Sequence, residues 1–308
     1  MDIMVILLQM IQLFLLIALG YGLRLIGMLD KELSRRLTTF VLDVTTPAMI
    51  LSSVLSGDGG QDRGRVLMML AISVGMYVLL PAVSWILTKL MRVPAKEQGL
   101  YLFMTVFSNV GYMGFPVIRA VFGEEAILYT AIVNLVFNLA VFTAGRMMMN
   151  LGSGKKTAVE IKSLISPGVV SSFVTLFIYF AGWKAPEIIA STVSMVGDMT
   201  TPLAMMLIGF SLAAVPVREV FSEFRIYPYT LLRQVALPAL AYPVLRMLVP
   251  DALLLGITLV ILAMPVGSIA VLFATEYGRD EALAAKTVFL TTLLSIGTIP
   301  LIVALFLT

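Results

Sequence analysis

The 308-residue chain is 60% hydrophobic and only 13% charged, with a mean hydropathy of +1.02 and a formal net charge of +3. This composition excludes an ordinary soluble domain and indicates a polytopic membrane protein. Cysteine and histidine are both absent, which excludes disulfides, thiol chemistry and histidine-ligated metals and removes the usual general base. We therefore expect no enzyme, no metal site and no cofactor, although carboxylate-bound ions remain compatible with the composition.

Ten apolar segments follow one another along the chain. The first starts almost at Met1, without a basic n-region or a small-residue cleavage site, and is interpreted as a membrane span. The longest polar pieces between segments, residues 57–65 and 152–160, are too short for an extramembrane domain. The sequence predicts an all-α membrane protein with ten transmembrane helices at residues 3–23, 36–55, 66–90, 99–122, 126–149, 161–182, 188–215, 225–249, 252–277 and 281–307.

The basic residues near the segment ends are unevenly distributed. If the N-terminus lies outside, 16 Lys and Arg residues fall at inside ends and 5 at outside ends. The positive-inside rule then predicts that both termini lie outside.

Motifs in the first half recur in the second half in the same order. Asp-x-Thr-Thr-Pro occurs at residues 43–47 and again at 198–202, an offset of 155. Pro116 and Pro265 stand in similar apolar contexts 149 residues apart, and Pro81 precedes Pro238 by 157. The chain thus divides into two five-helix repeats, residues 1–150 and 151–308, and the odd number of helices requires the second repeat to be inverted.

Residues 108–117, SNVGYMGFPV, interrupt the fourth segment, and residues 264–268 interrupt the ninth. We expect Pro116 and Pro265 to open the second half-helices, whose positive N-termini suit a carboxylate. The carbonyl ends of the first half-helices suit a cation or a hydroxyl, with neutral hydrogen bonds from Asn109 and Ser268. Gly111, which weakens the helix, is placed in the same substrate site. The alternative is that proline and glycine only kink these helices.

Asp43 and Asp198 are carboxylates inside membrane segments, where such groups are costly and commonly functional. They could carry a proton, bind sodium with neighbouring threonines, or pair with Arg233 or Lys286. A structural alternative is that the flanking threonines, Thr45, Thr46, Thr200 and Thr201, satisfy backbone groups freed by the prolines.

Three further polar residues lie close to these segments. Arg119 follows Pro116 by one turn, and we expect it to extend toward the membrane surface, although it could instead attract an anion. Asn134 and Asn138 share one face of the fifth segment and either reach the break or hold helices together.

The motifs around the two breaks resemble those of the auxin efflux carrier family. The similar stretches are residues 108–116, residues 122–126 with Asn138, residues 44–50, and residues 264–268 with 274–278. This resemblance implies an inverted-repeat fold in which spans 4 and 9 cross. It also implies a scaffold of spans 1, 2, 6 and 7, which forms a homodimer, and a moving transport domain of spans 3–5 and 8–10.

The resemblance also implies site residues. The family's substrate-contacting asparagine maps to Asn109, and its crossover prolines map to Pro116 and Pro265. Ser268 stands where relatives often carry asparagine, which leaves the exact substrate open. The short linker lacks the long loop of plant exporters, so we expect a prokaryotic protein of the cytoplasmic membrane.

The function predicted from these features is secondary transport of a small organic anion, auxin-like or malate-like, by an elevator mechanism. The expected partners are that anion, Na⁺ or H⁺, the lipid bilayer and a second copy of the chain, with no nucleic acid. A sodium or proton antiporter is the rival, although spans 4 and 9 place no carboxylate at their breaks. An intramembrane aspartyl protease is more remote, because the motifs around Asp43 and Asp198 fit it poorly.

Overall fold

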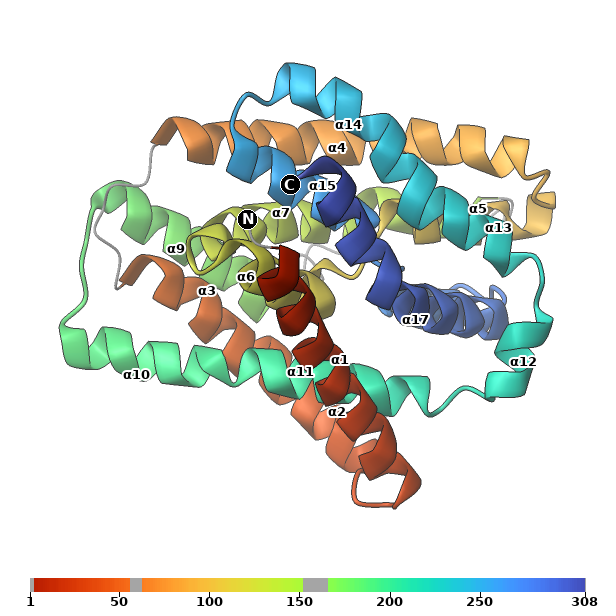
Figure 1. Ribbon diagram of the computed structural model, residues 1–308, viewed down its shortest axis with the longest axis horizontal. Coiled ribbons are helices and arrows are strands. Elements are labelled where there is room, and N and C mark those ends of the chain that lie inside the picture. The colour runs from red at the N-terminus through yellow and green to blue at the C-terminus, as the bar shows by residue number, and fades with distance from the viewer. Residues whose placement is uncertain (1–2, 56–62, 152–165, 308) are drawn as a thin grey trace. The chain divides into compact units, whose positions relative to one another are not determined.

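The computed structural model describes residues 3–55, 63–151 and 166–307, which are almost entirely helical (Figure 1). Within those ranges the only extended pairing is an isolated bridge between Ser108 and Val266. The predicted all-α class is confirmed, as expected for a chain whose backbone groups must be satisfied without water. The predicted linker, residues 152–160, lies outside the described residues, as does most of 57–65.

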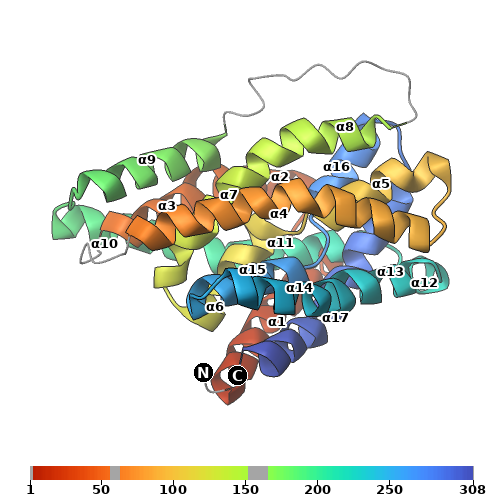
Figure 2. The same cartoon turned by 90° about the horizontal axis from the view of Figure 1, so that it is seen from above.

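Helices of the first half coincide with the predicted segments to within a few residues, and π-helical turns (η) interrupt several of them. The long helix α4 runs without a break and is seen at full length in Figure 2. The elements are α1 (Ile3–Leu25), α2 (Lys31–Phe40), η1 (Val41–Thr45), α3 (Thr46–Leu55), α4 (Arg63–Leu90), α5 (Ala95–Val106), η2 (Val110–Gly114), α6 (Phe115–Phe122), α7 (Glu125–Ala140), η3 (Val141–Gly145) and α8 (Arg146–Met149).

Helices of the second half also follow the prediction, except for α12, a six-residue helix after Pro216. It carries Arg218 and Glu219 and is too short and too polar to appear as an apolar segment. The elements are α9 (Pro167–Ala181), α10 (Glu187–Asp198), α11 (Thr200–Leu212), α12 (Val217–Ser222), α13 (Ile226–Leu231), η5 (Leu232–Ala236), α14 (Leu237–Leu248), α15 (Ala252–Ala263), α16 (Ile269–Glu276) and α17 (Glu281–Phe306).

Five helical runs in the described part of the chain are long and apolar enough to cross a membrane. They are Lys31–Leu55, Arg63–Leu90, Glu125–Met149, Glu187–Leu212 and Glu281–Phe306. Shorter apolar helices, among them Val110–Phe122 and Ala252–Ala263, account for parts of other predicted spans. A multi-pass membrane protein is therefore supported, whereas the number of crossings and the inversion of the repeat stay predictions.

The chain forms two compact units. The first unit contains Met1–Leu70, Gly111–Leu135 and Leu164–Ala214, and the second contains Ala71–Val110, Val136–Ser163 and Val215–Thr308. Each unit therefore combines segments from both halves of the sequence.

Three prolines follow π-helical turns at the same spacing. Pro47, Pro116 and Pro238 each lie two residues after a five-residue turn, η1, η2 and η5. A proline lacks the N–H that would bond the carbonyl four residues earlier, and its ring clashes with that carbonyl. In all three cases this carbonyl lies inside the wider turn, so the helix continues past the proline. Pro202 does not follow a π-helical turn. It is the third residue of α11, which begins at Thr200 after α10 ends at Asp198.

Within the first unit, α1 crosses α11 at very short range (Figure 1). A Cβ atom added to Gly20 would meet the backbone of Met206, and one added to Gly209 would meet the carbonyl of Ile17. Small residues allow such backbone contact between membrane helices, where van der Waals packing replaces the hydrophobic effect as the main attraction.

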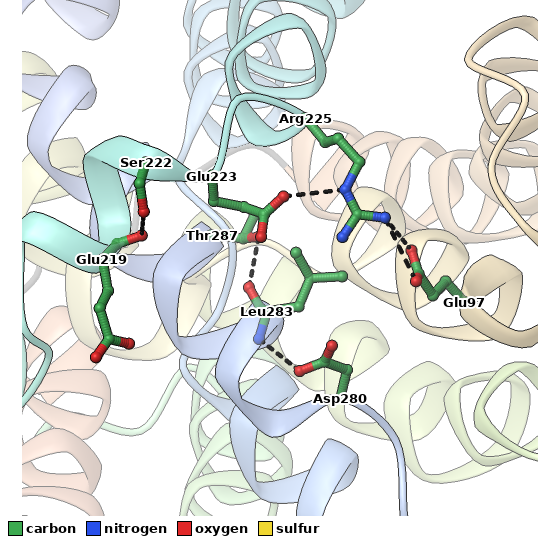
Figure 3. Close-up of polar contacts among 8 residues, drawn as sticks. All are labelled: Glu97, Glu219, Ser222, Glu223, Arg225, Asp280, Leu283 and Thr287. Atoms are coloured by element: carbon green, nitrogen blue, oxygen red, sulfur yellow. Dashed lines mark hydrogen bonds and ion pairs between the residues drawn. The ribbon is translucent and has the colours of Figure 1, made fainter.

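Within the second unit, ion pairs join α5 to the segment between α12 and α13, and Figure 3 also draws the N-terminal cap of α17. Arg225, which precedes α13, donates to Glu97 of α5 at 3.1 Å and to Glu223 at 2.9 Å. Asp280 caps α17 by accepting the Leu283 N–H at 2.9 Å. Because the Glu97 side chain is only 10% exposed, its ion pair with Arg225 is partly shielded from solvent.

We expect Glu97→Gln to lower the stability of the protein by about 1 kcal/mol, because it weakens a half-shielded pair. The matched control is Glu32→Gln. Glu32 pairs with Arg36 one helical turn away, but both side chains are more than 60% exposed, so the loss should stay below about 0.5 kcal/mol. The measurement is the melting temperature of each purified variant in detergent. Equal melting temperatures for the two variants would contradict the larger contribution expected of the Glu97–Arg225 ion pair.

Candidate substrate site at the two helix breaks

The fourth and ninth predicted spans are both interrupted. In span 4, α5 ends at Val106 and η2 begins at Val110; in span 9, α15 ends at Ala263 and α16 begins at Ile269. The break in span 9 lies where the sequence predicts it. The break in span 4 occupies residues 107–109, ahead of most of the predicted stretch, because residues 110–114 form a π-helical turn.

The two breaks pair with each other inside the second unit. The Asn109 N–H donates to the Pro265 carbonyl at 2.9 Å, and the Gly267 N–H donates to the Phe107 carbonyl at 3.0 Å. These bonds flank the antiparallel bridge between Ser108 and Val266. Backbone groups that lipid could not satisfy are thus satisfied by the opposite break.

Gly267 makes this approach possible. A Cβ atom at this position would lie 3.0 Å from the Ser108 carbonyl oxygen and 3.2 Å from the Phe107 carbonyl oxygen. Such distances leave no room for a side chain without a shift of the backbone.

A threonine of α17 supports the same break and was missed by the sequence analysis. The Val266 N–H donates to Thr291 Oγ1 at 3.2 Å, and the Gln234 side-chain amide of η5 donates to the Thr291 carbonyl at 2.8 Å. A signal was present in the repeat, because the offset of 157 between Pro81 and Pro238 also relates Asn134 to Thr291.

The two prolines do not open the second half-helices, which corrects the prediction. Pro116 is the second residue of α6 but follows the helical turn η2, so this half-helix begins at Val110. Pro265 lies inside the break, four residues before α16 begins at Ile269. Pro116 need not begin the helix, because the preceding π turn accommodates it. Pro265 stays outside the helix, where its carbonyl accepts a hydrogen bond from the Asn109 N–H of the opposite break.

The N-terminal end of α16 carries polar groups of the break that are open. Ser268 is exposed and stands at the N-cap, but its hydroxyl makes no capping hydrogen bond. Among the hydrogen bonds of the described residues, none has the N–H of Ser268 or Ile269 as its donor. A hydroxyl and two N–H groups at a helix start form a suitable site for a carboxylate.

The other predicted residues of this unit lie in different surroundings. Asn109 is buried, with 5% of its surface exposed, and Asn138 of α7 is half-buried. Arg233 of η5, treated in the sequence analysis only as a partner for an aspartate, is 2% exposed and donates through Nη1 to the Leu262 carbonyl at 2.5 Å. Leu262 is the last residue but one of α15, so this arginine reaches the chain just before the break.

The remaining predicted residues belong to the first unit. A Cβ atom at Gly111 would meet only the Asn134 side-chain oxygen, at 4.0 Å, so this asparagine of α7 faces the start of the span 4 half-helix. Pro116 is buried in α6. The structure thus places Asn109, Asn138, Pro265 and Ser268 in one unit and Gly111 and Pro116 in the other.

Asp198 forms an ion pair with Arg119 at 2.5 Å, and Arg119 also contacts Glu124 at 2.5 Å. The arginine side chain is 24% exposed, whereas Asp198 and Glu124 are 53% and 65% exposed, so its extension toward the membrane surface stays a prediction. Asp43 lies in η1 and interacts electrostatically with Tyr112 of η2. Both aspartates therefore act on the second half of span 4.

The structural role proposed for the neighbouring threonines holds for only one of them. Thr45 donates to the Val41 carbonyl at 3.3 Å within η1. The hydroxyls of Thr46, Thr200 and Thr201 are buried and have no hydrogen-bond partner among the described residues. Backbone capping therefore does not account for the whole Asp-x-Thr-Thr-Pro motif in either copy.

A cavity of about 670 Å³ lies between the end of α3 and the start of α10, within the first unit. Its lining includes Lys184 and Glu187, one residue of each charge, and none of the predicted site residues. The charges of these two residues offset each other, so the lining offers no net positive charge to an anion, and the breaks remain the better candidate site.

Known proteins are similar along nearly the whole chain. The model of the family described as membrane transport protein matches residues 5–161 and 156–303. An uncharacterized transporter of Methanocaldococcus jannaschii is 23% identical over 295 residues, which cover 93% of this chain and 94% of that protein. A protein of Rhizobium meliloti named "Putative malonate transporter" is 24% identical over 295 residues, with coverage of 93% and 91%. The chain therefore belongs to the membrane transport protein family, the auxin efflux carrier family that its crossover motifs resemble.

Proposed function

We propose that this protein is a secondary transporter that moves a small organic anion across the cytoplasmic membrane. Membership of a membrane transport family and the helical runs long enough to span a bilayer support transport in general. The chemistry of the α16 start supports a carboxylate as the transported group. Paired broken helices are the arrangement in which such transporters bind substrate near mid-membrane.

The observation that carries the proposal is the division of polar groups at the break. The carbonyls of Phe107, Leu262 and Pro265 all accept hydrogen bonds from the protein itself. The donors at Ser268 and Ile269 stay available, and Ser268 is exposed. Open N–H donors beside carbonyls that already accept hydrogen bonds favour an anion over a cation.

A small dicarboxylate is the substrate class we propose first. The name of the Rhizobium meliloti relative gives malonate as its substrate, and a three-carbon diacid is small enough to contact one break. Malate and an auxin-like aromatic acid remain the next candidates, because the motifs of the auxin efflux carrier family are shared with transporters of both.

We propose an elevator mechanism for the movement itself. In it, spans 3–5 and 8–10 carry the site past a scaffold of spans 1, 2, 6 and 7, which forms a homodimer with both termini outside. Coupling to H⁺ or Na⁺ would involve Asp43 or Asp198. Proton uptake by Asp198 would require its ion pair with Arg119 to open.

The test is a thermal-shift and solid-supported-membrane screen of malonate, malate and indole-3-acetate on purified protein, with and without Na⁺ and at two pH values. We expect Asn109→Ala and Ser268→Ala to weaken binding of the acid that responds by about tenfold, the loss of one good hydrogen bond to a charged group. The matched control is Ser191→Ala, an exposed serine of α10 that bonds only its own helix.

Three outcomes would contradict this proposal. One is unchanged binding of every acid in both break variants. Another is a response to Na⁺ or pH with no response to any acid, which is expected of the antiporter. The third is loss of acid binding in Asp43→Asn and Asp198→Asn together with detectable cleavage of a membrane peptide, which is expected of the protease.

A further inference from the structure

Arg233 is the largest fully buried side chain among the described residues, and it lies beside the break in span 9. Its Nη1 donates to the Leu262 carbonyl at 2.5 Å, while its Nε has no partner among the described residues. An arginine keeps its charge at any working pH. A full positive charge is therefore held inside the second unit, in contact with the last turn of α15.

No carboxylate compensates this charge within the described chain. Arg233 takes part in none of the ion pairs of those residues. The ionisable groups that act on it are the hydroxyls of Tyr77 and Tyr229, which are neutral at physiological pH. Burying a cation without a counter-charge is costly, and such residues in membrane segments are commonly functional.

The contact with Leu262 changes the charge of the break. The C-terminal end of a helix carries a partial negative charge, which would attract a cation to the end of α15. The guanidinium of Arg233 occupies this position, and its full positive charge is larger than the partial negative charge of the helix end. The remaining field at the break is positive, and it adds to the positive N-terminal end of α16 a few residues further along the chain.

We propose that Arg233 sets the anion preference of the break and makes it bind a dianion more tightly than a monoanion. This inference rests on the proposed function. Arg233 acts through its electric field and its hold on α15, so it is a specificity-determining residue that need not contact the substrate. The neighbouring Gln234 donates to the Thr291 carbonyl, and Thr291 Oγ1 accepts the Val266 N–H, so Gln234 supports the break through neutral hydrogen bonds.

The experiment compares malonate with its monomethyl ester at pH 8, where malonate carries two negative charges and the ester carries a single one. Dissociation constants are measured by calorimetry on full-length protein in detergent for the native protein, Arg233→Gln and Arg233→Lys. The matched control is Arg24→Gln. Arg24 also donates to a carbonyl near the end of a helix, that of Phe210 in α11 at 3.2 Å, but it lies in the other unit.

We expect Arg233→Gln to weaken binding of the ester about tenfold and binding of malonate about a hundredfold. The reason is that the interaction energy with an electric field is proportional to the charge of the ligand. Arg233→Lys should retain the ratio of the two constants, and Arg24→Gln should change neither. An equal loss for both ligands would overturn the inference, since a merely structural role cannot distinguish their charges.

The native protein provides a further measurement if Arg233→Gln does not fold. Equal affinity of the native protein for malonate and the ester would overturn the role of Arg233 and leave the proposed function intact. A native protein that binds no organic anion at all would overturn both.

Discussion

Replacing Gly267 with valine is expected to abolish substrate binding and to destabilise the protein by about 1–3 kcal/mol, the usual cost of overpacking. A Cβ atom at this position lies 3.0 Å from the Ser108 carbonyl oxygen, and valine adds two methyl groups beyond it. The backbone of one break must then move away from the other. This movement would lengthen the hydrogen bonds from Gly267 to Phe107 and from Asn109 to Pro265.

Gly75 provides the matched control for this substitution. It lies in α4, in the same unit, and a Cβ atom there would meet nothing within 4 Å. Gly75→Ala should leave binding unchanged and increase stability by up to about 1 kcal/mol, since alanine favours a helix. Binding is measured by thermal shift with malonate, and stability by the melting temperature without ligand. Normal binding in Gly267→Val would show that the paired breaks are not the substrate site.

Replacing Gly20 with valine is expected to destabilise the protein by about 3 kcal/mol or more, because it overpacks a backbone contact between two helices. The backbone of Met206 occupies the position of the new Cβ atom, and backbone cannot be moved aside as a flexible side chain can. α1 would have to separate from α11. Gly209→Ala should have a similar effect, because its Cβ atom would meet the carbonyl of Ile17 on the opposite helix.

Gly22 lies two residues further along α1, where a Cβ atom would meet nothing within 4 Å. Gly22→Val is therefore the matched control, with the same change of helix propensity and no clash. The melting temperature and the elution profile of the three variants in detergent are compared with those of the native protein. Similar behaviour of Gly20→Val and Gly22→Val would show that α1 and α11 are not packed as described.

The positions of the helices were predictable because they depend on features that are local in sequence. Segment ends came within a few residues, since a membrane helix needs a continuous apolar run and polar residues mark its limits. The interruption at residues 264–268 was predictable for the same reason, because proline and glycine weaken a helix wherever it packs. Pro116 was interpreted wrongly, because a π-helical turn can accommodate a proline and leaves no distinct signal in the sequence.

The composition of the candidate site was predictable only in part. Asn109 and Ser268 stood out because they are polar residues at breaks in an apolar segment. Thr291 and Arg233 did not, because threonine is common in membrane helices and an arginine near the end of a predicted span resembles an interfacial residue. Their importance comes from contacts with Val266 and Leu262, which lie 25 and 29 residues away.

By itself, the sequence determined that this is a helical membrane protein of repeated design with paired interruptions, because composition, apolar run length and internal similarity are properties of the chain alone. Only the tertiary structure decided that residues 107–109 meet residues 264–267, that Asp198 pairs with Arg119, and that a buried arginine lies beside the break. Such contacts depend on which helix faces pack together. In a membrane segment nearly every face is apolar, so the sequence does not distinguish the packed face from the lipid-facing one.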